Sequence, residues 1–166
     1  FNEYSLEEPV KLYILLAYPD PSVYLAVQSD MLTDDSFLKA SAGYNSIPAL
    51  EAVYTRYETF LLEAFDKLPS LVIPAEKKNL FELRTYESVH EDAGRRKIAM
   101  FNNEEIALFL KVGLMPVFFG KILAGQYMPA LTYMVGFKDM TERDAIWKKF
   151  GEHEEWNRMR VKPEYA

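Results

Sequence analysis

The 166-residue sequence contains no cysteine and only two histidines. The absence of cysteine excludes disulfide bonds, thiolate metal sites and a cysteine nucleophile. His90 and His153 cannot by themselves supply a metal site with three histidine ligands. Long apolar runs are also missing, because stretches such as Leu12–Tyr18 and Leu114–Leu123 fall short of the ~20 residues that span a bilayer. We therefore predict no transmembrane segment, no metal site and no cofactor.

The chain has fewer positively charged residues than negatively charged ones. The 19 Lys and Arg residues are outnumbered by 25 Asp and Glu residues, which gives a formal net charge of −6 and a pI near 5.0. Binding the phosphates of a nucleic acid needs clustered positive charge, so we predict no nucleic-acid partner. Hydrophobic residues, in contrast, make up 49% of the chain and aromatic residues 14%. This composition is sufficient for a buried core and excludes a disordered chain.

Composition and alternation predict strands over Val10–Tyr18, Leu80–Tyr86, Met115–Ala124 and Ala130–Phe137. The last two are separated by a short loop and are typical of an antiparallel hairpin. Tyr57–Phe65 fits either a strand or a helix. The chain contains no nucleotide-binding glycine motif, no serine-hydrolase motif and no zinc-protease motif.

Helical periodicity predicts a helix over Arg95–Val112, ended by Gly113, and another that begins at the N-cap residue Thr141. Shorter helices are predicted in the first third of the chain, over Val23–Leu32 and from Asp34 to Ala40.

An internal repeat relates Leu12–Gln28 to Leu131–Trp147. A strand, a turn with Asp, a Ser or Thr cap and a helix recur in the same register, although any two strand–turn–helix units share this pattern. The second copy belongs to a run of strand, helix, strand, strand and helix, which is most of a βαββαβ ferredoxin-like plait.

We therefore predict an α+β chain with two repeats. Residues 1–69 form a partial first repeat, residues 70–78 a linker and residues 79–166 the second repeat. On this interpretation the first repeat lacks its opening strand and helix, and the second lacks its closing strand.

The second half resembles the NIPSNAP domain. The matching stretches are FELRTYES at 81–88, EEIALFLKVGLMPVFFGKILAG at 104–125, PALTYMVGFKDMTERDAIWKKF at 129–150 and EEWNRMR at 154–160. The first half, with VKLYILLAY and YTRYETFLLEAFDKLP, is similar to the degenerate first plait of tandem bacterial members.

This resemblance implies two tandem ferredoxin-like plaits packed sheet to sheet as an α/β barrel of the dimeric α/β-barrel superfamily. The two plaits of such a barrel come from one chain or from a homodimer. We expect a soluble protein, and the sequence leaves its compartment open between the bacterial cytoplasm and export. The superfamily includes cofactor-independent monooxygenases, haem-degrading enzymes and proteins without known activity, and the NIPSNAP family supplies no agreed catalytic residues.

Glu82, Arg84 and Tyr86 project from one face of a single predicted strand. If that face turns toward a second sheet, we expect Arg84 to bind an anion while Tyr86 or Glu82 assists proton transfer. The alternative is an ion pair between Glu82 and Arg84, with Tyr86 as a hydrogen-bond partner and no ligand.

Three further residues complete the candidate pocket. His90 follows the strand closely and is either a general base at the pocket mouth or an exposed loop residue. Phe118 and Phe119 are adjacent and must point to opposite faces of their strand, one under a helix and one between the sheets. Phe118 and Tyr133 either pack in the core or line a cavity for a planar small molecule.

These residues leave three hypotheses for function. The first is binding of a small aromatic or anionic molecule between two sheets, the second is a cofactor-independent monooxygenase and the third is a non-catalytic protein-interaction module. An enclosed cavity that touches Glu82, Arg84 and Tyr86 favours the first two. A site filled by side chains, together with an exposed apolar patch, favours the third.

Overall fold

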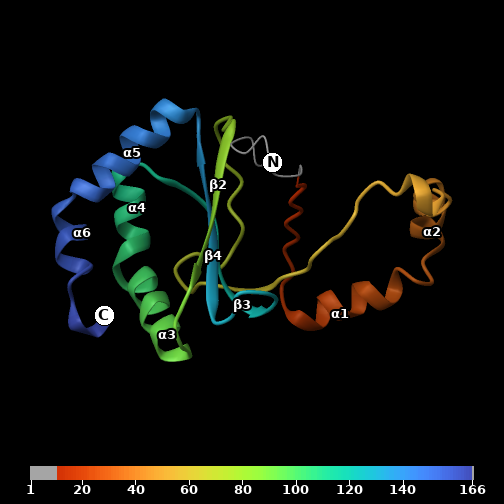
Figure 1. Cartoon of the computed structure of the whole chain (residues 1–166), viewed down its shortest axis with the longest axis horizontal. Helices are drawn as coiled ribbons and strands as arrows, with labels where there is room; N and C mark the ends of the chain where they lie inside the picture. The colour runs from red at the N-terminus through yellow and green to blue at the C-terminus, as the bar shows by residue number, and fades with distance from the viewer. Residues whose placement is uncertain (1–10, 166) are drawn as a thin grey trace. The chain divides into compact units, whose positions relative to one another are not determined.

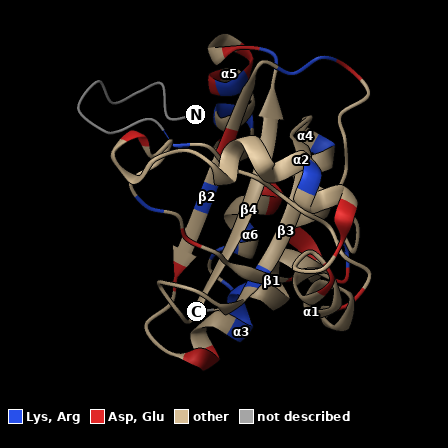
Figure 2. Ribbon diagram, turned by 90° about the vertical axis from the view of Figure 1, so that its right-hand side faces the viewer, with Lys and Arg blue, Asp and Glu red and all other residues tan. Residues whose placement is uncertain are grey.

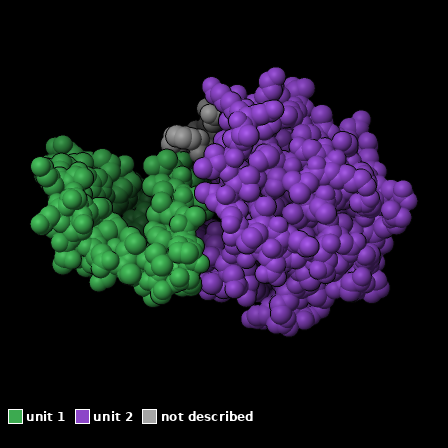
Figure 3. Space-filling view, turned by 180° about the vertical axis from the view of Figure 1, so that it is seen from behind, with its two compact units in different colours: residues 1–57 green, residues 58–166 purple. Residues whose placement is uncertain are grey.

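The computed structural model describes residues 11–165. The chain divides into two compact units, Phe1–Tyr57 (unit 1) and Glu58–Ala166 (unit 2), which Figure 3 draws in green and purple. No helix within residues 11–165 is both long enough and apolar enough to cross a membrane.

Unit 1 contains two helices, α1 (Pro21–Asp30) and α2 (Asp35–Asn45), and a 3-10 turn at Ala49–Glu51. The helix that was predicted to begin after Ser22 begins earlier, because the side chain of Asp20 caps α1 by accepting hydrogen bonds from the first backbone N–H groups. None of the described residues of unit 1 is fully buried.

The strand predicted over Val10–Tyr18 is wrong for Lys11–Tyr18, the part of it that the structure describes. This segment has no regular secondary structure, and Leu12, Ile14 and Leu16 are exposed. Apolar, β-prone composition alone does not make a strand, because a strand also needs a neighbour for its backbone hydrogen bonds. Val10 lies outside the described residues.

Unit 2 is built on a four-stranded antiparallel sheet in the order β1-β3-β4-β2. The strands are β1 (Leu61–Ala64), β2 (Leu80–Glu87), β3 (Met115–Ala124) and β4 (Ala130–Phe137). The predictions for β3 and β4 are confirmed at both ends, and β2 is one residue longer than predicted. The ambiguous segment 57–65 contains β1, an edge strand that pairs with β3.

Helices cover one face of this sheet (Figure 1). They are α3 (Glu91–Met100), a π-helical turn (Phe101–Glu105), α4 (Ile106–Val112), α5 (Met140–Glu152), α6 (Glu154–Met159) and a 3-10 turn (Pro163–Tyr165). The chain order of β2, α3–α4, β3, β4 and α5, with β4 between β2 and β3, is an α+β arrangement compatible with a ferredoxin-like fold.

Two helix boundaries differ from the sequence predictions. The helix predicted over Arg95–Val112 begins earlier, at Glu91, and is interrupted by the π-turn. The N-cap of α5 is Asp139 rather than Thr141, because the carboxylate of Asp139 accepts a hydrogen bond from the backbone N–H of Glu142 at 2.9 Å. Gly113 ends α4 with a φ of 97°, which confirms its predicted role.

An aromatic cluster fills the space between the helices and the sheet. Phe101, Phe109, Phe119 and Tyr133 are almost completely buried there. The rings of Phe119 and Tyr133 stack with 5.0 Å between their centroids, and those of Phe101 and Phe119 lie 5.4 Å apart. Seen in Figure 2, β3 and β4 carry few charged residues, in keeping with their place at the centre of the sheet.

Candidate functional site

The two faces of β2 differ in their surroundings. Glu82, Arg84 and Tyr86 are half-buried, whereas the alternate residues Phe81 and Leu83 are exposed. Arg84 lies opposite Tyr133 of β4, so the polar trio is on the face that packs under the helices. Within unit 2, the face with the polar trio is thus covered by helices rather than by a second sheet.

Glu82 is the centre of this polar cluster. Its carboxylate accepts hydrogen bonds from Arg84 Nε at 2.6 Å, Arg143 Nε at 2.7 Å and Trp147 Nε1 at 3.0 Å. Arg143 and Trp147 are four residues apart on α5 and therefore share a helix face. Burial alone raises the pKa of Glu82, but the hydrogen bonds from Arg143 and Arg84 outweigh burial and hold this pKa below its usual value.

Arg84 is held on three sides. Its guanidinium carbon lies 3.9 Å from the centre of the Trp147 ring, its Nη1 is 3.5 Å from the hydroxyl of Tyr86, and Glu82 neutralises its charge. The Tyr86 hydroxyl is in turn 3.2 Å from that of Tyr133. Burial raises the pKa of Tyr133, so this phenol stays protonated.

A second ion pair lies beside the first. Glu105 ends the π-helical turn, is only 3% exposed and accepts a hydrogen bond from Lys97 Nζ at 2.9 Å. Lys97 also lies 4.6 Å above the ring of Phe101. Burial raises the pKa of Glu105, and the charge of Lys97 only partly offsets that effect.

The polar cluster is therefore filled by its own side chains. Glu82 and Arg84 form an ion pair with Tyr86 as a neighbour, which is the alternative that needs no ligand. Arg84 is the member of the cluster that retains spare N–H donors, and its side chain is 31% exposed. Among the described residues, no three His, Cys, Asp or Glu side chains are placed to hold a metal ion.

The other predicted residues do not join the cluster, apart from Tyr133. His90 is exposed and caps α3, because its Nδ1 accepts a hydrogen bond from the backbone N–H of Ala93 at 3.1 Å. Phe118 is half-buried on the face opposite the helices, while Phe119 is buried beneath them. The two adjacent rings thus point to opposite faces, as predicted.

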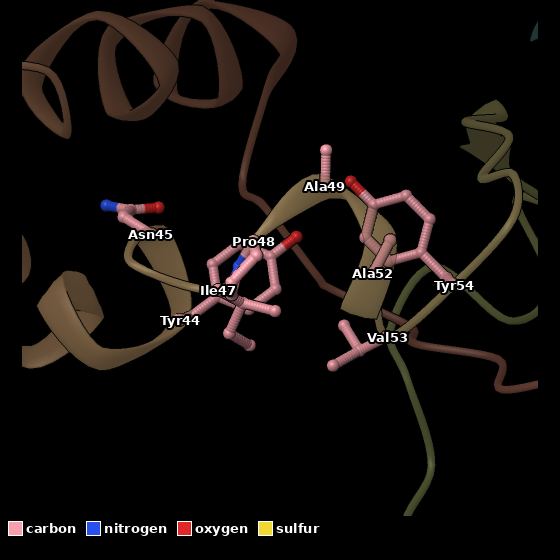
Figure 4. A pocket seen from close by; sticks show the side chains of 8 residues that line it. All are labelled: Tyr44, Asn45, Ile47, Pro48, Ala49, Ala52, Val53 and Tyr54. Atoms are coloured by element: carbon pink, nitrogen blue, oxygen red, sulfur yellow. The ribbon is translucent and has the colours of Figure 1, made fainter.

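Two surface hollows in the described part of the chain contain none of the predicted residues. One belongs to unit 1, has a volume of about 310 Å³ and lies between Tyr44 and Tyr54 (Figure 4). The other, of about 280 Å³, lies beside β1 and α3 and is lined by Phe65, Asn102 and charged side chains.

Four members of the two polar clusters were not identified from the sequence. Arg143 and Trp147 bind Glu82 of β2, and Lys97 binds Glu105. The spacing of Arg143 and Trp147 was the available signal, since it predicts a shared helix face. Lys97 and Glu105 are eight residues apart across a π-turn, a spacing that a regular helix pattern does not pair.

The family model for NIPSNAP matches residues 81–166, which is just over half of the chain. The chain belongs to the NIPSNAP family. The search of curated proteins found no match. The NIPSNAP domain includes β2, the helices that cover it, β3 and β4, and so contains every residue of the polar cluster around Glu82. Unit 1 and β1 precede the matched region.

Proposed function

We propose that the NIPSNAP domain of this chain is a non-catalytic association module. On this proposal the sheet face opposite the helices packs against a second ferredoxin-like sheet, and the two form an α/β barrel. The observation that carries the proposal is a row of apolar side chains on that face. Leu83, Met134 and Phe118 are direct cross-strand neighbours on β2, β4 and β3, and no helix of unit 2 covers them.

Exposure along this row supports association. Phe81 and Leu83 expose 46% and 37% of their surface, and Phe118 and Met134 are only half-buried. Leu62 and Phe81 pack closely over Gly120 and Gly136 on the same face, since an added Cβ would meet their side chains at 3.0 Å and 3.2 Å. A contiguous apolar surface of this kind is typical of an interaction site.

The polar cluster supports the same proposal from the other side of the sheet. Arg84 stacks on Trp147 and pairs with Glu82, and His90 caps a helix. These were the residues expected to act on a substrate, and each has a structural role in unit 2. We therefore assign no catalytic step to them.

Association is tested by thiol accessibility, since the chain has no cysteine of its own. Phe81 on the sheet face and Leu110 on α4 expose similar fractions, 46% and 57%. If a second sheet covers the face, the thiol of a Phe81→Cys variant reacts with a maleimide much more slowly than that of a Leu110→Cys variant. Denaturant should abolish the difference. Equal rates in the folded protein contradict the proposal.

Binding of a small planar aromatic molecule against this face is the second candidate. It is favoured by the exposed hydroxyl of Thr85, a polar group within an apolar wall that donates to the buried hydroxyl of Thr132 at 3.2 Å. The probe is 1-anilinonaphthalene-8-sulfonate, a planar aromatic anion. Its saturable fluorescence should be lost in Met134→Lys and kept in Leu110→Lys, and unchanged binding in Met134→Lys contradicts the assignment.

A further inference from the structure

Two loops meet at the end of the sheet where β2 finishes and β4 begins. One is the loop of residues 88–90 between β2 and α3, and the other is the hairpin loop of residues 125–129 between β3 and β4. The backbone N–H of Ser88 donates to the carbonyl of Pro129 at 2.8 Å, which joins the two loops. A Cβ added at Gly94 of α3 would lie 3.5 Å from the Ser88 hydroxyl and 3.9 Å from the Pro129 ring. The two loops and the start of α3 therefore form one continuous surface, which we call the loop surface.

The loop surface exposes three large apolar side chains. Val89 is 90% exposed, Tyr127 54% and Met128 51%. Tyr127 has a φ of 67°, a left-handed conformation that is strained for a bulky residue and that is found most often at functional sites. Tyrosine and methionine are also enriched at protein–protein interfaces. The loop surface thus has an apolar centre with the composition of an interaction site.

Negative charge surrounds this apolar centre. Glu87 ends β2 and Glu91 begins α3, and Glu58 is held beside the hairpin loop by a hydrogen bond from Gln126 at 3.0 Å. All three glutamates are exposed. None of their carboxylates forms an ion pair with a residue in the range 11–165.

The cations on the neighbouring turns of α3 and on β3 do not compensate this charge. Arg95 and Arg96 both bind Asp92, and Lys121 lies 3.7 Å from Glu63. Each of these cations is therefore already paired with a carboxylate outside the group of three. The rim of the loop surface retains a net negative charge.

We propose that the loop surface binds a basic polypeptide segment of another protein, in which apolar side chains are interspersed with lysine or arginine. The apolar side chains of that segment pack on Val89, Tyr127 and Met128, and the flexible thioether of Met128 adapts to their shape. Its cations pair with the three carboxylates of the rim, so charge complementarity fixes its position.

The same charges disfavour other occupants. A second copy of this chain fits poorly, because each copy has a formal net charge of −6 and the two repel each other. Anionic lipid headgroups and nucleic acids are repelled by the negative rim as well. The loop surface lies beyond the ends of the strands, whereas Leu83 and Met134 of the sheet face lie within them. The proposal therefore does not depend on the sheet-face association.

Binding is tested by fluorescence anisotropy with the full chain. The probe is a short fluorescein-labelled synthetic peptide in which lysine and leucine alternate, and its counterpart has glutamate in place of every lysine. We expect saturable binding of the lysine peptide, weakened by salt, and no binding of the glutamate peptide. Absence of saturable binding, or equal binding of both peptides, overturns the proposal.

The position of the bound peptide is tested by placing a lysine on different surfaces. Met128→Lys removes an apolar contact and adds a repelling charge, so it should raise the dissociation constant at least about tenfold. Leu110→Lys adds the same charge on the exposed side of α4 and should change the dissociation constant less than about threefold. Met134→Lys reports on the sheet face. Loss of binding in Met134→Lys without loss in Met128→Lys assigns the peptide to the sheet face and overturns the proposal.

The role of the rim is tested by a variant in which its three carboxylates are replaced by amides, namely Glu58→Gln, Glu87→Gln and Glu91→Gln. Its dissociation constant for the lysine peptide should rise at least about tenfold. The matched control makes the same change in net charge at three exposed carboxylates elsewhere, namely Asp30→Asn, Glu51→Gln and Glu76→Gln. An equal loss of binding in the two triple variants means that net charge alone attracts the peptide, and it overturns the proposal.

Discussion

The carboxylate of Glu82 on β2 accepts a hydrogen bond from the indole N–H of Trp147 on α5, with 3.0 Å between the two heavy atoms. The same carboxylate binds Arg143 of α5 and Arg84 of β2. One side chain thereby fixes the position of a helix on a sheet strand that lies more than sixty residues earlier in the chain. The charge of this carboxylate neutralises Arg84 and, together with Asp144, Arg143.

Replacing Glu82 by glutamine tests this role. Glu82→Gln keeps the size of the side chain but leaves Arg84 without a neutralising charge and Arg143 with the exposed Asp144 alone, so we expect the free energy of unfolding to fall by about 2 kcal/mol. Urea denaturation measures this fall in the free energy of unfolding, and the m value should stay unchanged. Asp144→Asn is the control, because Asp144 also pairs with Arg143 but is largely exposed. Its effect should stay within about 0.5 kcal/mol, and an equal loss in both variants contradicts a special role for Glu82.

Acid should weaken the Glu82 cluster. The pKa of Glu82 is lowered in the folded protein, so the unfolded chain binds the proton first and the stabilisation from Glu82 is present above the ordinary glutamate pKa of about 4.3. It is lost as the pH falls below that value. The difference in unfolding free energy between the unmodified chain and Glu82→Gln should therefore shrink between neutral pH and the lowest pH at which both remain folded. A constant difference across this range contradicts the assignment.

Glu105 should behave in the opposite sense. Its pKa is raised by burial, so the folded protein holds the proton more tightly than the unfolded chain above about pH 4.3. Ionisation of Glu105 therefore lowers the stability of the folded protein as the pH rises from about 4.3 toward neutrality. Glu105→Gln removes the titration, and its unfolding free energy relative to the unmodified chain should rise as the pH increases above about 4.3 toward neutrality. A relative stability that falls over this range is the contrary result.

The strands of the NIPSNAP domain could be predicted from the sequence because each combines β-prone composition with clear turn signals at its ends. The hairpin of β3 and β4 has both, and its bounds were predicted at both ends. Leu12–Tyr18 also has β-prone composition and is followed by the turn residues Pro19–Pro21, yet none of its residues lies in a strand. Pairing is a tertiary property, so local composition does not determine it.

For the candidate site, the sequence did not predict which face of β2 is buried. A period of two along β2 predicted two distinct faces but did not say which one the helices cover. The charged face is covered because α5 brings Arg143 and Trp147 to Glu82 and Arg84, which satisfies the charges within the protein. The apolar face with Phe81 and Leu83 is the exposed one. Only the positions of residues sixty apart in sequence decide between these orientations.

The aromatic cluster should depend strongly on Phe101. This residue is fully buried at the start of the π-turn, and its ring contacts those of Phe65, Phe109, Phe119 and Tyr133. Phe101→Ala should lower the free energy of unfolding by about 3–5 kcal/mol, because it removes a large apolar group and leaves a cavity. Leu110→Ala, on the exposed side of α4, should cost less than about 1 kcal/mol. Thermal unfolding of both variants measures the difference, and comparable losses would contradict the central place of Phe101.

Gly113 and Gly151 offer a matched test of backbone conformation. A methyl group added at either position meets no atom within 4 Å, so sterics do not distinguish the two sites. Gly113 ends α4 with a φ of 97°, which alanine adopts only with strain, whereas Gly151 lies within α5. Gly113→Ala should therefore destabilise the protein by about 1 kcal/mol or more, and Gly151→Ala should stabilise it by up to about 1 kcal/mol. Chemical denaturation of both variants gives the two signs. The same sign at both positions would mean that the left-handed backbone at Gly113 is not what ends α4.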